Sequence, residues 1–100
     1  YKRQVRYRTE QLRKVCEDAS VAGKKYGAEM AVKIQLRIDQ LQAALSVEML
    51  VSGRIGRCHQ LQGDRKGQYA MDLTHPYRLI FEKVNEQIIA VKVLEIVDYH

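Results

Sequence analysis

The sequence predicts an α+β fold in which two N-terminal helices pack on one face of a twisted antiparallel sheet. Three observations support this prediction. Apolar side chains recur every three or four residues over residues 10–45, as they do in helices, and alternate after residue 57, as they do in strands. The connections between the later strands are short, and short connections make neighbouring strands antiparallel. The chain of 100 residues is long enough for one core, so we expect a single domain over residues 1–100.

The first predicted elements are a short edge strand and a helix. Residues 5–8 alternate apolar and basic side chains, a pattern that protects an edge strand from unwanted pairing. Thr9 has the chemistry of a helix N-cap, and the apolar residues that follow it lie on one face of a helix over residues 10–26. Gly27 suits the left-handed position at which many helices end.

The second predicted helix covers residues 28–45. Its apolar stripe consists of Met30, Ile34, Ile38, Leu41 and Leu45, whereas Lys33, Arg37 and Asp39 fall on other faces. The segment that follows Leu45, through Ser52 and Gly53 to Gly56, is predicted to be a linker, because the periodicity disappears there.

Four strands are predicted in the second half of the chain, over residues 58–61, 68–73, 77–84 and 88–97. Tyr69, Met71 and Leu73 share one face of their strand. Because the helices cover one face of the sheet, its other face is available for a functional site.

The chain is basic, with 17 Lys and Arg, 12 Asp and Glu, a net charge of +5 and a pI near 9.4. Residues 1–50 contribute +4, residues 51–78 contribute +3 and residues 79–100 contribute −2. A polyanion is therefore the first partner to consider. No run approaches the roughly 20 apolar residues of a membrane helix, so no membrane partner is expected. Two cysteines do not make a disulfide framework and no leader pattern opens the chain, which together favour a cytoplasmic location.

Several enzyme classes lack support in the sequence. There is no phosphate-binding glycine loop with a Lys-Ser/Thr ending, and no serine stands in a strained nucleophile elbow. Cys58 and His59 are adjacent in a predicted strand, so they point to opposite faces and do not form a metal-ligand pair. We expect neither a metal nor another cofactor.

The polar residues of the sheet half suit a different chemistry. They are His59, Arg65, Lys66, Arg78, Asp98, Tyr99 and His100. Metal-free cleavage of an RNA phosphodiester needs a base for the 2′-hydroxyl, an acid for the leaving oxygen and a cation for the phosphorus centre, and each role has a candidate here. If the last strand continues to its end, strand alternation places Asp98 and His100 on one face and Tyr99 on the other.

Each of these residues also has a structural explanation. His59 could be a partly buried strand residue, and Arg78 could pair with Asp72 on the neighbouring strand. Arg65 and Lys66 could simply keep a loop soluble.

Three segments together resemble the HigB group of the RelE/ParE toxin superfamily. They are residues 58–69, 76–81 and 95–100. The corresponding family motifs are a His-x-Leu-(Lys)-Gly-Asp-Arg-x-Gly loop, an aromatic-Arg-(Leu/Ile)-(Ile/Thr)-Phe strand and an Asp-Tyr-His ending. The resemblance covers residues 57–100 and implies a RelE-like fold.

The resemblance implies the toxin of a type II toxin-antitoxin system, which cleaves messenger RNA on the ribosome without a metal. It is held inactive by a cognate antitoxin, expected to be of the helix-turn-helix type and to provide the only link to operator DNA. The implied catalytic residues are His59, Arg78, Asp98, Tyr99 and His100, with Tyr99 also suited to stacking on a base. The implied phosphate contacts are Arg57, Gln62, Arg65 and Lys66. Gln62 stands where relatives often have a lysine, so Lys66 or Arg65 substitutes for that cation or activity is reduced.

Two alternatives remain open at this stage. ParE-like relatives poison DNA gyrase by binding it, but the Asp98-Tyr99-His100 ending favours cleavage. A module that binds RNA or DNA and has lost catalysis is the other alternative, and Gln62 is the residue that suggests it.

Overall fold

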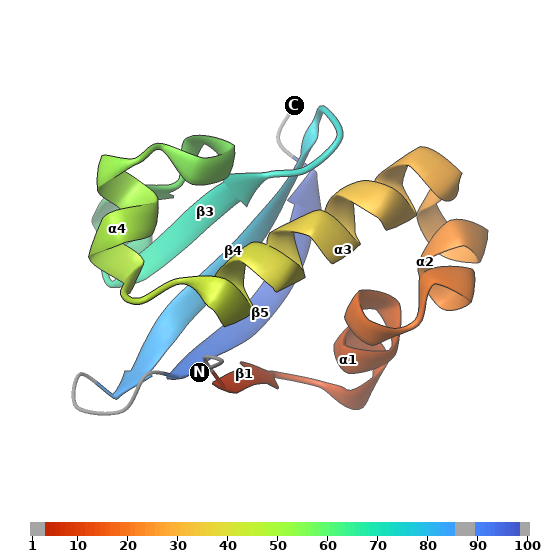
Figure 1. The fold of residues 1–100 in the computed structure, drawn as a ribbon, viewed down its shortest axis with the longest axis horizontal. Helices are drawn as coiled ribbons and strands as arrows, with labels where there is room; N and C mark the ends of the chain where they lie inside the picture. The colour runs from red at the N-terminus through yellow and green to blue at the C-terminus, as the bar shows by residue number, and fades with distance from the viewer. Residues whose placement is uncertain (1–3, 86–89, 99–100) are drawn as a thin grey trace.

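The computed structural model describes residues 4–85 and 90–98, which form a layer of helices on one face of a five-stranded sheet (Figure 1). The elements are β1 (Gln4–Tyr7), α1 (Glu10–Glu17), α2 (Ala19–Tyr26), α3 (Ala28–Ala43), α4 (Val47–Ser52), η1 (Ile55–Arg57), β2 (His59–Gln60), η2 (Gly63–Arg65), β3 (Gln68–Asp72), β4 (Tyr77–Asn85) and β5 (Ala90–Asp98). The predicted α+β class, with helices first and the sheet afterwards, is confirmed.

The sheet has the strand order β1-β5-β4-β3-β2, so β1 is an edge strand as predicted. Strands β2 to β5 pair antiparallel, which is what their short connections require. Strand β1 instead pairs parallel with β5, so the sheet is mixed and not antiparallel throughout. A parallel pair needs a long crossover, and the helices between β1 and the later strands provide one.

The single helix predicted over residues 10–26 is two helices. Thr9 caps α1 as predicted, because its hydroxyl accepts a hydrogen bond from the Leu12 N–H at 3.1 Å. At Asp18 the backbone becomes extended (φ −121°, ψ 107°), and the carboxylate caps α2 by accepting from the Ser20 N–H at 2.9 Å. Gly27 has a positive φ of 96°, but its ψ of 163° lies outside the left-handed helical region that we predicted.

The second predicted helix ends before the last residue of its apolar stripe. Helix α3 stops at Ala43, so Leu45 lies beyond it with 68% of its surface exposed. The predicted linker contains α4, which begins where the Ser46 hydroxyl accepts from the Met49 N–H at 3.2 Å. Val47 and Leu50 of this short helix are buried. Two buried side chains therefore fix α4 to the core, although six residues are too few to form a helix alone.

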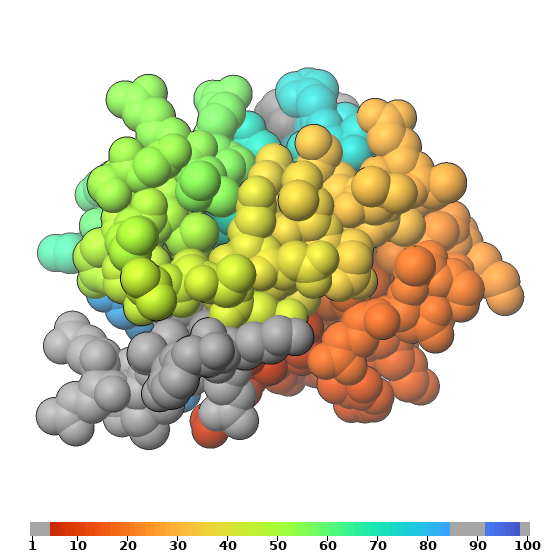
Figure 2. All heavy atoms as spheres, in the orientation of Figure 1, coloured from red at the N-terminus to blue at the C-terminus, as the bar shows by residue number. Residues whose placement is uncertain are grey.

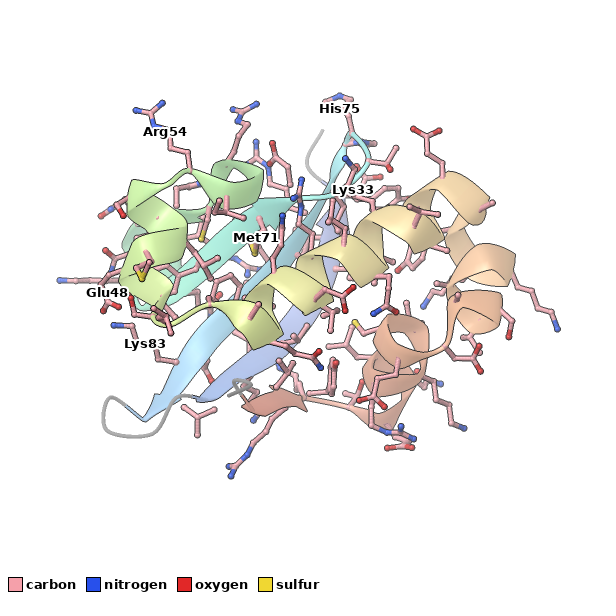
Figure 3. The ribbon with its side chains drawn as sticks, viewed as in Figure 1. Lys33, Glu48, Arg54, Met71, His75 and Lys83 are labelled. Atoms are coloured by element: carbon pink, nitrogen blue, oxygen red, sulfur yellow. The ribbon has the colours of Figure 1, made fainter. Side chains whose placement is uncertain are left out.

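The main core lies between the helices and the sheet, and on this face of the molecule α3 lies in the middle, α4 to its left and α1 and α2 to its right (Figure 2). Its fully buried members include Ile34, Ile38 and Leu41 from α3 and Met71, Leu79 and Phe81 from the strands. Met71 points into this layer, and Lys83 of β4 forms an ion pair with Glu48 of α4 at its margin (Figure 3). Tyr69, Met71 and Leu73 share the helix-covered face, as predicted.

A second, smaller cluster lies on the opposite side of the sheet. Ala70, Ile80 and Leu94 are buried there, with Leu61 and Val97 packed against them. We call this side of the sheet the open face. None of the helices in the described residues is long and apolar enough to cross a bilayer.

Candidate active site

Strand register decides which of the predicted residues share the open face. His59 pairs with Ala70, which belongs to the open-face cluster, so the imidazole also lies on that side. Arg78 lies between Asp72 on β3 and Val97 on β5, again on the open face. The register therefore places the predicted catalytic residues His59 and Arg78 on the same side of the sheet.

The half-buried His59 ring has a defined tautomer in its neutral form. Its Nδ1 lies 2.9 Å from the backbone carbonyl oxygen of Arg57. A carbonyl only accepts hydrogen bonds, so Nδ1 carries the hydrogen and the lone pair is on Nε2. Nε2 can then take a proton, which is what a general base requires.

Asp72 holds two guanidinium groups together. One carboxylate oxygen lies 3.4 Å from Nε of Arg78, and the other lies 3.4 Å from Nε of Arg57. The pairing of Arg78 with Asp72 that the sequence suggested is therefore confirmed. Both distances exceed the 2.7–2.9 Å typical of a close charge-assisted hydrogen bond, so an incoming phosphate can compete with Asp72 for these cations.

The loop residues predicted to contact phosphate differ in their surroundings. Arg65 donates to the Glu95 carboxylate at 2.5 Å and to the Gln68 side-chain oxygen at 3.0 Å. Its charge is thus balanced within the protein. Gln62 and Lys66 are exposed in the same loop.

The end of the chain is described only in part. Asp98 is exposed and pairs with Tyr77, whose ring packs edge-on against Tyr26 of α2 with centroids 5.3 Å apart. Asp98 therefore ends β5 one pair beyond Arg78 and Val97, on the strand next to the one that carries Arg78. Tyr99 and His100 lie outside the described residues.

Arg37 is more buried than its place in the helical pattern predicts. We predicted it on a polar face of its helix, but only 9% of it is exposed. Its Nε donates to the backbone carbonyl of Asp72 at 2.7 Å, and a terminal nitrogen donates to the Gln40 side chain at 2.9 Å. These two hydrogen bonds explain how a guanidinium is tolerated in the core, even though burial lowers its pKa. The signal in the sequence was its position between the apolar residues Ile34 and Leu41.

Arg37 also braces the segment before His59. Gly56 has φ +59°, and a Cβ built there would lie 2.7 Å from Cζ of Arg37. The guanidinium therefore fits against the turn only because this position has no side chain. Through Gly56 in η1 and the Asp72 carbonyl in β3, Arg37 connects α3 to the turn before His59 and to the strand that carries Asp72.

Replacing Gly56 with alanine is therefore expected to destabilise the fold. Gly63→Ala is the matched control, because Gly63 has a similar φ of +68° but nothing within 4 Å of the added Cβ. Both variants strain the backbone, whereas only Gly56→Ala also displaces Arg37, which adds about 1–3 kcal/mol. Urea denaturation measures the difference in unfolding free energy. Equal losses in the two variants would mean that Arg37 does not brace this turn.

Cys58 lies beside the candidate active site, but its thiol is unreactive at neutral pH. It is buried, and burial raises the pKa of its thiol to about 11. The thiol is therefore protonated at neutral pH and is neither a nucleophile nor a metal ligand in that form. Within residues 4–85 and 90–98, no three His, Cys, Asp or Glu side chains are grouped as metal ligands.

Comparison with known proteins identifies the fold. No family model and no curated protein matches the chain. A YoeB/ParE toxin from Agrobacterium tumefaciens has a similar structure, with 14% identity and a TM-score of 0.63 over 97% of this chain and 99% of that one. The YoeB-YefM complex from Staphylococcus aureus gives 17% identity and a TM-score of 0.64, covering 100% and 99%.

A third similar structure is the toxin-antitoxin complex RelBE2 from Mycobacterium tuberculosis, with 13% identity, a TM-score of 0.55 and coverage of 99% and 100%. At these identities the likeness establishes a shared fold. The predicted RelE-like architecture is therefore confirmed over nearly the whole chain.

Proposed function

We propose that this chain is the toxin of a type II toxin-antitoxin pair, in the HigB group of the RelE/ParE superfamily, and that it cleaves messenger RNA on the ribosome. The fold agrees with this proposal, because a protein described as a toxin and a chain of a toxin-antitoxin complex share it over almost their full length. The observation that carries the proposal is the open face, where His59, Arg57 and Arg78 surround one accessible surface. This surface combines a proton acceptor with two guanidinium groups and suits a phosphodiester substrate.

In the proposed reaction, Nε2 of His59 takes the proton of the RNA 2′-hydroxyl. The 2′-oxygen then attacks the adjacent phosphorus, and the bond to the 5′-oxygen breaks, leaving a 2′,3′-cyclic phosphate. Arg78 and Arg57 turn from Asp72 toward the phosphate and stabilise its developing charge. No metal or other cofactor is required.

The leaving 5′-oxygen must receive a proton, and we assign this role to the Asp98-Tyr99-His100 ending. His59 and His100 share the acid and base duties with Asp98, and the sequence motif supports this assignment. Tyr99 stacks on a base of the substrate. Because Arg65 is balanced by Glu95, Lys66 is the better substitute for the family lysine that Gln62 replaces.

A cognate antitoxin is the proposed protein partner. One of the similar structures is a toxin-antitoxin complex and another is the YoeB-YefM complex, which supports a partner of this kind. We propose a helix-turn-helix antitoxin that carries all contact with operator DNA. The net charge of +5 favours an acidic partner segment and also favours approach to the ribosome.

The purified chain, incubated with ribosomes that carry a reporter messenger RNA, is expected to shorten the transcript within the decoding site. Primer extension maps the cut. A chelator selective for transition metals leaves the ribosomal magnesium in place and is expected not to slow cleavage. Induction in a bacterial host should arrest growth with the same cuts.

Two results would contradict the proposal. Growth arrest with DNA-damage signalling and intact transcripts would indicate a gyrase poison. RNA binding without cleavage in any ribosomal assay would indicate a module that has lost catalysis.

A further inference from the structure

A hollow beside the candidate active site has no role in the proposed reaction. Its volume is about 320 Å³, and it is lined by Val51, Arg54, Arg57, Cys58 and His59. It therefore lies next to β2, which is an edge strand of the sheet. None of these lining residues is acidic, and two are arginines.

The backbone of this segment is held in an unusual conformation. Arg54 has φ 51° and Arg57 has φ 56°, both in the left-handed region that side chains other than glycine seldom adopt. Each such residue costs about 1–2 kcal/mol. Packing around the turn, including the contact of the Arg37 guanidinium with Gly56, offsets this strain energy. Such strain is commonly found where side chains must be presented to a ligand.

The two arginines of the hollow differ in their contacts. Arg57 shares the Asp72 carboxylate with Arg78, so it belongs to both the hollow and the open face. Arg54 extends outward from the end of α4 (Figure 3) and, within the described ranges 4–85 and 90–98, forms no ion pair. Its charge is therefore available to a ligand at no cost in internal contacts.

We propose that this hollow is a second phosphate subsite, which binds an RNA phosphate next to the one that reacts. The inference rests on the proposed function for the identity of the polyanion. His59 and Arg57 border both places, so a strand that crosses His59 enters the hollow at its next phosphate. Arg54 then binds only this neighbouring phosphate and takes no part in the reaction.

A carboxylate from a partner protein competes with an RNA phosphate as the anion that these two arginines bind. RNA is favoured because the hollow shares His59 and Arg57 with the candidate site, and an RNA strand supplies anions in a continuous row. An acidic protein segment would bind here equally well without any relation to His59.

The test compares Arg54→Gln with Arg8→Gln, which removes the same charge from an exposed residue that follows β1, at the other edge of the sheet. The probe is a fluorescent RNA oligonucleotide with 2′-O-methyl groups, which cannot be cleaved. Fluorescence anisotropy over a range of salt concentrations gives Kd. We expect Arg54→Gln to weaken binding about tenfold and to reduce the slope of log Kd against log salt by about 0.7, the value for one phosphate of a single strand. Arg8→Gln should change both quantities much less.

Equal effects of the two substitutions would overturn the subsite, because the loss would then reflect net charge alone. The subsite is also wrong if Arg54→Gln binds RNA as tightly as wild type but loses affinity for a glutamate-rich peptide. The binding assay is independent of catalysis. A chain that cleaves nothing, yet shows the specific loss in Arg54→Gln, would refute the proposed reaction and retain the subsite.

Discussion

Replacing His59 with asparagine is expected to reduce transcript cleavage by roughly 10²–10⁴-fold, the usual contribution of general acid-base catalysis. The asparagine amide can donate to the Arg57 carbonyl as Nδ1 does now, so the local structure is retained. It has no group that takes a proton at neutral pH. The loss should therefore appear in the single-turnover cleavage rate on programmed ribosomes, and the affinity for uncleavable RNA should change little.

Two further variants show whether this effect is specific. His59→Ala removes the hydrogen bond to Arg57 as well as the proton acceptor, so a loss equal to that of His59→Asn would assign the effect to proton transfer. His75→Asn is the matched control, because His75 is exposed in the turn between β3 and β4 (Figure 3). If His59→Asn cleaved as fast as His75→Asn, His59 would not be a catalytic residue.

The strands were predictable from the sequence because apolar and polar residues alternate along them as buried and exposed side chains do. Strands β3 and β4 lie within one residue of their predicted ends, and Tyr69 and Met71 face the helices. The cross-strand pair of Asp72 and Arg78 followed from the same pattern, since a short antiparallel connection fixes which residues are opposite. Local periodicity and short-range topology agree in this part of the chain.

The helical half was predicted less well, because a polar residue there either faces solvent or forms a hydrogen bond that caps a helix or holds a buried side chain. Asp18 and Ser46 have no distinctive sequence context, yet each caps a helix that the pattern did not reveal. The helical spacing predicts Arg37 on a face other than the apolar stripe. Its burial depends on two acceptors, the Asp72 carbonyl and Gln40, and the first is 35 residues away in sequence. Nothing local to α3 indicates that contact.

The candidate site shows a similar limit. Its residue types follow from their chemistry and from a family resemblance, but the face that Asp98 occupies depends on an irregularity in β5. Val93 and Ile96 both face the helices, although strict alternation forbids this for residues three apart. A register shift opposite Ile80 and Phe81 adds one residue at Leu94 and reverses the alternation. Asp98 therefore shares the side of Tyr77, which counting from Val93 would not predict.

Replacing Phe81 with alanine is expected to give the largest loss of stability, about 3–5 kcal/mol. Its side chain is 0% exposed and stacks on Tyr69 with ring centroids 5.5 Å apart, so the change leaves a cavity under the helices. Such a loss is a large share of the roughly 5–15 kcal/mol that stabilises a typical domain. Val84→Ala, in the same strand at 39% exposure, should cost less than about 1 kcal/mol. Urea denaturation followed by circular dichroism, with both changes made in a His59→Asn chain to avoid toxicity, measures the difference. Similar midpoints for the two variants would show that the core does not depend on this ring, whereas a Phe81→Ala chain that is unfolded without urea would exceed the expected loss in the same direction.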